Sequence, residues 1–223
     1  MERWKGRVAL VTGASMGIGA AIAGDLVKNG MVVVGCARHV EDIQKTAEDL
    51  ASEAGHLIPM KCNLAKIEDI ESMFRAITEQ VGGVDVCINN AAVASVESTL
   101  ISGPPSEFKT VYDVNLLAAT TVAHLSIKSM KERNVNDGHI INISSSMGHT
   151  VLEYGNLHTY SATKHALNAI TEGLRHELRN ENSTIRTTVI CPSLVQTGST
   201  QDFLLEKALQ VPEKAGFLLL ITT

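Results

Sequence analysis

Several features that would point to a membrane, a nucleic acid or an export route are missing from this sequence. No apolar run approaches the roughly 18 residues of a membrane span, and the most apolar tail, Gly216–Ile221, is far shorter. The N-terminus shows no signal-peptide core. Lys and Arg (19) are interleaved with Asp and Glu (24), so a net charge of -5 leaves no basic stripe for nucleic acid. We therefore expect a cytoplasmic chain with a small-molecule partner, no nucleic-acid partner and no membrane span.

Cysteine is also scarce, with four residues at Cys36, Cys62, Cys87 and Cys191 and no C-x-x-C pair. A disulfide framework or a cysteine-rich metal site normally requires closer, paired spacing. We expect isolated apolar thiols, no disulfide and no metal site.

Short β-branched apolar runs alternate along the chain with longer helical patterns. Near-continuous Val, Ile and Leu is typical of parallel strands buried on both faces, and right-handed crossovers then give a doubly wound sheet. We expect one α/β domain over residues 1–223, with three layers. The predicted strands are Arg7–Thr12, Met31–Cys36, Leu57–Lys61, Val84–Asn89, His139–Ser144 and Ile185–Cys191. The predicted helices are Gly17–Asn29, Val40–Ala54, Ile67–Val81, Glu107–Arg133 and Thr159–Asn180.

Three glycines, Gly13, Gly17 and Gly19, stand where the first predicted strand turns into a helix. This pattern favours dinucleotide binding, because the turn needs positive φ, a pyrophosphate needs unshielded N–H groups, and a helix N-terminus is partly positive. An ordinary glycine-rich turn is one alternative. A second is a hydrolase, because the same residues spell G-x-S-x-G around Ser15. Only one strand precedes Ser15, however, and no recognisable motif places a partner histidine.

The second predicted strand ends without an acidic residue. NAD-binding folds place a carboxylate about 20 residues beyond the glycine turn, where it binds the ribose 2′-hydroxyl. Here the strand ends in Gly35-Cys36-Ala37-Arg38. Arg38 can pair with a 2′-phosphate, so the sequence favours NADP over NAD. The alternative is that Arg38 is simply an exposed, solvated charge in a loop.

Tyr160 and Lys164 stand one turn apart near the start of a predicted helix. A phenol ionises near about pH 10, and a nearby positive charge lowers that pKa, so the pair suits proton exchange with a carbonyl oxygen. The spacing alone also occurs on many exposed helix faces. The position of the Tyr160–Lys164 pair in the chain supports a catalytic role. The strand upstream of it ends in the Ser144–Ser146 triplet, where a hydroxyl can stabilise a developing alkoxide. Asparagine is a poor helix former, so Asn115 inside a predicted helix is expected either to be exposed or to be kept there for a specific local role.

In this order the motifs resemble the short-chain dehydrogenase/reductase family, and within it the subgroup of insect farnesol dehydrogenases and vertebrate dehydrogenase/reductase family member 11. The resemblance runs from roughly residue 5 to 200 and implies a Rossmann fold. Its motifs are Thr12-Gly-x-x-x-Gly-Ile-Gly19, Asn89-Asn-Ala-Ala92, Asn115, the serine triplet, Tyr160-x-x-x-Lys164 and Pro192-x-x-Val-x-Thr197.

The resemblance also implies residue roles. A catalytic tetrad falls on Asn115, Ser145, Tyr160 and Lys164, with Ser145 chosen because it lies three residues before Gly148. Lys164 is also implied to hold the nicotinamide ribose, and Asn115 to position a water in a proton relay. The implied cofactor-binding residues are Gly13, Ser15, Gly17, Ile18, Gly19, Arg38, Asn63, Leu64, Asn90, Ala91, Tyr160, Lys164, Pro192, Val195 and Thr197.

The chain departs from the family pattern at a few positions. Asn63 replaces a usual Asp, and Ala92 and Ser193 each replace a usual Gly. Few residues follow Pro192, so the resemblance implies a short C-terminus without a seventh strand, an open sheet edge and a doubtful homo-oligomer.

The function predicted from these features is NADP-dependent hydride transfer between nicotinamide and a carbonyl or alcohol. We expect an apolar substrate, such as an isoprenoid alcohol or a steroid-like ketone, because Leu152, Tyr154, Leu194 and Phe203 stand near the expected site. The alternative is a catalytically weak NADP-binding or regulatory protein, since a short C-terminus would shield the substrate less from water.

Overall fold

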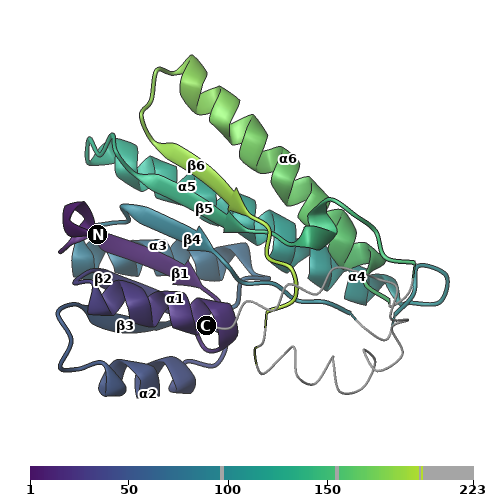
Figure 1. Cartoon of the computed structure of the whole chain (residues 1–223), viewed down its shortest axis with the longest axis horizontal. Coiled ribbons are helices and arrows are strands. Elements are labelled where there is room, and N and C mark those ends of the chain that lie inside the picture. Colours follow the sequence, from purple (N-terminus) through teal and green to yellow (C-terminus); the bar gives the residue numbers. More distant parts are fainter. Residues whose placement is uncertain (96–97, 154–155, 196, 198–223) are drawn as a thin grey trace.

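The computed structural model describes residues 1–95, 98–153, 156–195 and 197. In this part of the chain six strands form one parallel sheet in the order β3-β2-β1-β4-β5-β6 (Figure 1). The predicted doubly wound α/β fold is therefore confirmed. The expectation of a missing seventh strand concerns residues 198–223, which lie outside the described residues. The strands are β1 (Val8–Thr12), β2 (Val32–Ala37), β3 (His56–Lys61), β4 (Val86–Asn89), β5 (His139–Ile143) and β6 (Arg186–Ile190).

Helices cover both faces of the sheet, because successive strand residues point to opposite faces. On β1, Leu10 belongs to one buried cluster, whereas Ala9 and Val11 belong to the other. The first cluster is closed by α3 (Ile67–Val81), α5 (Ala119–Glu132) and α6 (His158–Asn180), and the second by α1 (Gly17–Lys28) and α2 (Glu41–Asp49). No helix within the described ranges is long and apolar enough to cross a membrane.

The predicted helix Glu107–Arg133 is interrupted in the structure. It consists of α4 (Pro105–Tyr112), a π-helical segment, η2 (Asp113–Ala118), and α5. Asn115 lies in the π-helical segment and is 1% exposed. The alternative that Asn115 is an exposed residue is therefore wrong, and its local reason lies in the site described below.

Helix α2 ends at Asp49, short of the predicted end at Ala54. Beyond it, the N–H of Gly55 donates to the carbonyl of Val27 at 2.9 Å. A Cβ on Gly55 would lie 2.1 Å from the carbonyl oxygen of Met31. The chain leaves the helix because Gly55 has to pack tightly against the corner between α1 and β2.

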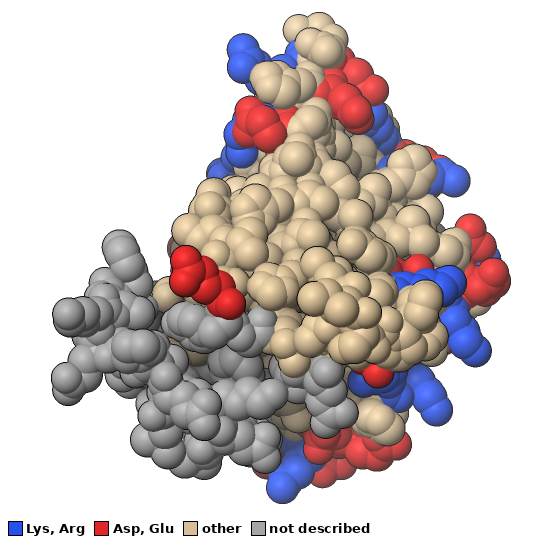
Figure 2. All heavy atoms as spheres, turned by 90° about the vertical axis from the view of Figure 1, so that its right-hand side faces the viewer, with Lys and Arg blue, Asp and Glu red and all other residues tan. Residues whose placement is uncertain are grey.

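The strand order places a crevice at one edge of the sheet. From β1 the chain proceeds outward to β2 and β3, and from β4 outward in the opposite direction to β5 and β6. The crossovers on the two sides diverge, so ligands of such sheets bind at the carboxyl ends of the central strands. Figure 2 views the molecule from the side that carries α4 and these strand ends, and uncharged side chains cover most of that view.

All four cysteines are free thiols. Cys36 and Cys62 are buried and lie close enough to influence each other's pKa, because β2 and the end of β3 lie side by side. Cys191 is half-buried and lies outside both core clusters. Within the described residues, no three His, Cys, Asp or Glu side chains gather as a metal site would require.

Candidate functional site

The glycine turn between β1 and α1 leaves the N-terminus of α1 open. Gly13 and Gly17 have φ values of +68° and +57°, in the region that favours glycine. The helix begins at Gly17 without a side-chain cap, so its first N–H groups can face an anion. A Cβ on Gly19 would lie 2.2 Å from the carbonyl oxygen of Gly13. The backbone of the turn therefore favours glycine at Gly13 and Gly17, and close packing requires it at Gly19.

Thr12 and Asn90 fasten this turn to the end of β4. The Asn90 amide donates to the carbonyls of Thr12 at 2.9 Å and Gly13 at 3.1 Å. The Thr12 hydroxyl accepts the backbone N–H groups of Asn90 and Ala91 at 3.0 and 3.1 Å. Asn90 therefore shapes the cofactor crevice through the turn. The sequence placed Thr12 at the start of the glycine motif without giving it a role of its own, although its place between a buried strand and Gly13 is a usable signal.

The other candidate cofactor residues gather at the same sheet edge, next to the ends of β2, β3 and β6. Arg38 directly follows β2 and is exposed. The side-chain oxygen of Asn63 accepts the N–H of Ala65 at 3.2 Å, which shapes the turn after β3. Thr197 lies against Gly17, since a Cβ built on that glycine would be 3.4 Å from it. Ser15, Ile18 and Pro192 are partly buried, and Leu64 and Val195 are buried.

Tyr160 and Lys164 lie on the first turns of α6, beside the end of β5. Lys164 is 2% exposed, and its Nζ donates to the carbonyl of Ile143 at 2.8 Å. The same Nζ lies 5.4 Å from the centre of the Tyr160 ring. The Ser145 hydroxyl is hydrogen-bonded to the Tyr160 phenol. The structure thus brings Ser145, which follows β5, together with Tyr160 and Lys164, which share one helix.

Burial dominates the protonation of this group. It raises the pKa of Tyr160, and the hydrogen bond from Ser145 partly offsets that rise. It lowers the pKa of Lys164 to about 8, an effect that Cys191 partly opposes. The expectation that Lys164 would lower the pKa of Tyr160 is therefore not met in this structure. A protonated phenol beside an ammonium that titrates near neutral pH suits proton donation.

The three serines after β5 have different surroundings. Ser144 is buried, and its hydroxyl donates to the carbonyl of Lys164 at 3.2 Å. Ser145 caps the short turn Ser146–Gly148 by accepting the N–H of Met147 at 3.1 Å. The Ser146 N–H donates to Pro192 O at 2.8 Å. Ser145 therefore contacts Tyr160, as the sequence prediction requires, while Ser144 anchors α6.

Asn115 connects the π-helical segment to the loop after β4 and to α6. Its side chain accepts the N–H of Val93 and donates to the carbonyl of the same residue, each at 2.8 Å. It also donates to the Thr163 hydroxyl at 3.1 Å, and that hydroxyl donates to the carbonyl of Tyr160 at 2.7 Å. Asn115 thereby positions the turn of α6 that carries Tyr160. Thr163 was missed by sequence analysis because nothing local distinguishes it from other small helical residues.

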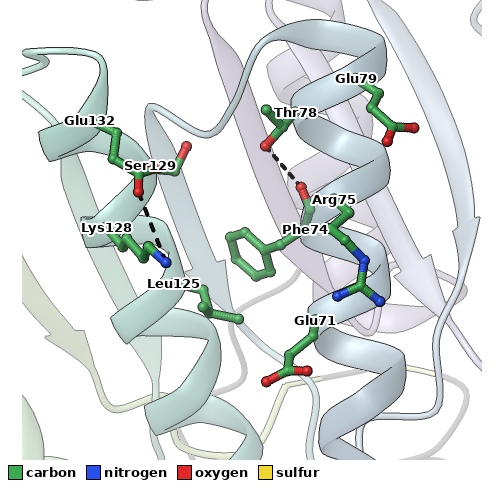
Figure 3. A pocket seen from close by; sticks show the side chains of 9 residues that line it. All are labelled: Glu71, Phe74, Arg75, Thr78, Glu79, Leu125, Lys128, Ser129 and Glu132. Atoms are coloured by element: carbon green, nitrogen blue, oxygen red, sulfur yellow. Dashed lines mark hydrogen bonds and ion pairs between the residues drawn. The ribbon is translucent and has the colours of Figure 1, made fainter.

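A separate groove of about 510 Å³ lies between α3 and α5 (Figure 3). Phe74 and Leu125 face one another across it, and charged side chains surround them. None of the candidate site residues lines this groove. It is lined by Glu71, Phe74, Arg75, Thr78, Glu79, Leu125, Lys128, Ser129 and Glu132.

Comparisons with known proteins agree with this geometry. Residues 7–208 match the family model described as short chain dehydrogenase. The chain is 55% identical over 200 residues to "Dehydrogenase/reductase SDR family member 11" of Gallus gallus, covering 89% of this chain and 78% of that protein. It is 42% identical over 207 residues to "Farnesol dehydrogenase" of Aedes aegypti, covering 92% of this chain and 84% of that protein. These matches confirm the resemblance seen in the sequence, including the subgroup.

A solved structure gives the same result for the fold. The crystal structure of a short-chain type dehydrogenase/reductase from Mycobacterium marinum superposes with a TM-score of 0.85 at 27% identity, covering 92% of this chain and 80% of that one. The glycine turn with Ser15 is therefore the cofactor turn of an oxidoreductase family rather than a hydrolase elbow. The chain belongs to the short-chain dehydrogenase/reductase family, whose members are oxidoreductases that use a nicotinamide cofactor.

Proposed function

We propose that the chain is an NADP-dependent oxidoreductase that interconverts a carbonyl and an alcohol on an apolar substrate. The observation that carries this proposal is the meeting of Ser145, Tyr160 and Lys164 at the carboxyl edge of the sheet. The open helix N-terminus of the glycine turn lies at the same edge.

The residues of the crevice fit a dinucleotide. The N–H groups at the start of α1 would hold the pyrophosphate, with Thr197 beside Gly17. Arg38, exposed after β2, supplies the positive charge that a 2′-phosphate needs, and no carboxylate stands at that strand end. These features favour NADP over NAD. The bound nicotinamide would supply or accept the hydride.

Tyr160 handles the proton in this proposal. In the reduction direction its phenol donates a proton to the substrate oxygen, and burial keeps that phenol protonated at neutral pH. Ser145 lies next to the same phenol, and its hydroxyl can turn to donate to the substrate oxygen and stabilise its developing negative charge. Lys164, with a pKa of about 8, returns a proton towards Tyr160. Asn115 holds the Tyr160 turn through Thr163.

Three observations support an apolar substrate. Few charged residues lie in the middle of the described part of the face that carries α4 and the strand ends (Figure 2). Leu152 and Leu194, two of the four residues expected to line the substrate, are partly buried there, whereas Tyr154 and Phe203 lie outside the described residues. The similarity to farnesol dehydrogenase of Aedes aegypti adds support. We propose an isoprenoid alcohol or a steroid-like ketone as the substrate.

Cofactor binding and turnover test this proposal separately. NADPH should raise the melting temperature more than NADH does, and NADPH oxidation should be seen with a panel of ketones, aldehydes and the aldehydes of isoprenoid alcohols. Arg38→Asp should remove the preference for NADPH, because a carboxylate repels a 2′-phosphate and can bind a 2′-hydroxyl. Arg75→Asp, at an exposed position on α3, is the matched control and should leave the preference unchanged.

Tyr160→Phe should keep the NADPH-induced shift and lose turnover by about 100-fold or more. No shift with either cofactor contradicts the proposal. A shift with NADPH and no turnover on any substrate supports the alternative of an NADP-binding or regulatory protein.

A further inference from the structure

A second group of reactive side chains lies beside the proposed catalytic residues, after the end of β6. The imidazole Nε2 of His149 lies 3.3 Å from the Sγ of Cys191. The side chain of Asn168, on α6, is 3.4 Å from the same Nε2, and its oxygen is 3.8 Å from the same sulfur. A thiol, an imidazole and an amide are thus mutually in contact.

The contacts place an acceptor for the thiol proton beside Cys191. The Asn168 amide also donates to the carbonyl of Gly148 at 3.0 Å, which holds it in place. In the tautomer that leaves Nε2 of His149 unprotonated, this nitrogen can take the thiol proton of Cys191. Lys164, one of the proposed catalytic residues, lies close enough to Cys191 for the two side chains to interact. A nucleophile, a base and an orienting amide are the parts that thiol addition needs.

The other three cysteines lack these features. Cys36, Cys62 and Cys87 are 0%, 1% and 0% exposed, whereas Cys191 is partly exposed and His149 is exposed. All four cysteines belong to the described residues. One thiol of the chain therefore combines solvent access with a contacting imidazole.

We propose that Cys191 is a nucleophilic thiol that adds covalently to α,β-unsaturated carbonyl compounds, with His149 as its base. His149 takes the thiol proton, and the sulfur forms a bond to the β-carbon of the electrophile. The π electrons move to give an enolate, and the proton returns from His149 to the α-carbon. The adduct has the summed mass of protein and electrophile, and no oxidant or reductant is consumed.

The position of the adduct gives it a consequence for the proposed oxidoreductase. Cys191 immediately precedes Pro192, whose carbonyl holds Ser146 next to Ser145. A group attached to Cys191 would therefore lie close to Ser145 and Lys164, and it should interfere with turnover. The addition itself does not require hydride transfer, so it can be measured whether or not turnover is found.

N-ethylmaleimide, an α,β-unsaturated dicarbonyl, is the probe, and intact-protein and peptide mass spectrometry are the readouts. The folded wild-type chain should gain one adduct, on Cys191, before any other cysteine reacts. His149→Gln should slow that addition by about tenfold, since the base is lost. His165→Gln is the matched control, because His165 is exposed on α6 and bonds the carbonyl of Ser161. It should react at the wild-type rate.

Cys191→Ser should give no adduct under the same conditions and should keep its activity after N-ethylmaleimide treatment that inactivates the wild type. First labelling at a different cysteine, or no adduct on the folded wild type, overturns the proposal. An equal rate in His149→Gln and wild type overturns the role of His149. Loss of NADPH turnover in every variant, with single labelling of Cys191 intact, would contradict the proposed function and leave the thiol chemistry standing.

Discussion

Replacing Lys164 by methionine should abolish turnover and make the chain more stable. The ammonium of Lys164 is 2% exposed, and burial lowers its pKa from 10.5 to about 8. Below about pH 8 that shift corresponds to roughly 3 kcal/mol of destabilisation of the folded state. The hydrogen bond from Nζ to the carbonyl of Ile143 at 2.8 Å offsets about 1 kcal/mol of this destabilisation. Lys164→Met, of similar length and uncharged, should therefore raise the free energy of unfolding by about 2 kcal/mol near pH 7.

The pH dependence provides an internal check on this reasoning. The folded pKa lies below the unfolded one, so between about pH 8 and 10.5 the unfolded chain binds more protons and wild-type stability rises with pH. The gap between wild type and Lys164→Met should shrink over that window. Urea unfolding followed by the fluorescence of Trp4 and by circular dichroism, at about pH 7 and about pH 9.5, measures it.

Lys128→Met is the matched control, because that side chain is 60% exposed on α5 and makes a 3.9 Å ion pair with Glu132. Its stability should change by less than about 0.5 kcal/mol. If Lys164→Met is less stable than wild type near neutral pH, or if the gap does not change with pH, the buried ammonium does not carry the cost assigned to it.

Three further predictions concern other parts of the fold. Gly19→Ala should destabilise the chain by about 2 kcal/mol or more, since its Cβ would lie 2.2 Å from a backbone oxygen of the glycine turn. Gly24→Ala on the same helix should stabilise it by about 0.5–1 kcal/mol, because its Cβ meets nothing closer than 3.9 Å; equal effects in urea unfolding would refute the packing argument. Asn115→Ala should cost about 2–3 kcal/mol, because the N–H and carbonyl of Val93 lose their partner, and an unchanged unfolding midpoint would contradict this. Burial, aided by two arginines, lowers the pKa of His139 to about 4. The free energy of unfolding should therefore fall as the pH drops from about 6.5 towards 4, because the unfolded chain binds the proton of this histidine first. His139→Gln should flatten that decline in a pH series of thermal melts.

Most of the fold was predictable because its signals are local. Continuous Val and Ile runs marked the strands, and the predicted helix Ile67–Val81 coincides with α3. The glycine turn was readable because positive φ and close packing leave glycine few substitutes at Gly13 and Gly19. The break in the helix around Asn115 was not predictable, because it depends on contacts with Val93 and with Thr163, 48 residues away.

The sequence by itself determined the parallel sheet, the cofactor turn and the pairing of Tyr160 with Lys164 on one helix face. Each depends on residues close together in the chain, whose periodic burial and backbone conformation follow from their type. Only the tertiary structure decided that burial rather than Lys164 dominates the pKa of the Tyr160 phenol, and that His149 meets Cys191, 42 residues away. The physical reason is that these contacts, and the loss of water around them, exist only once β5, β6 and α6 pack together at one edge of the sheet.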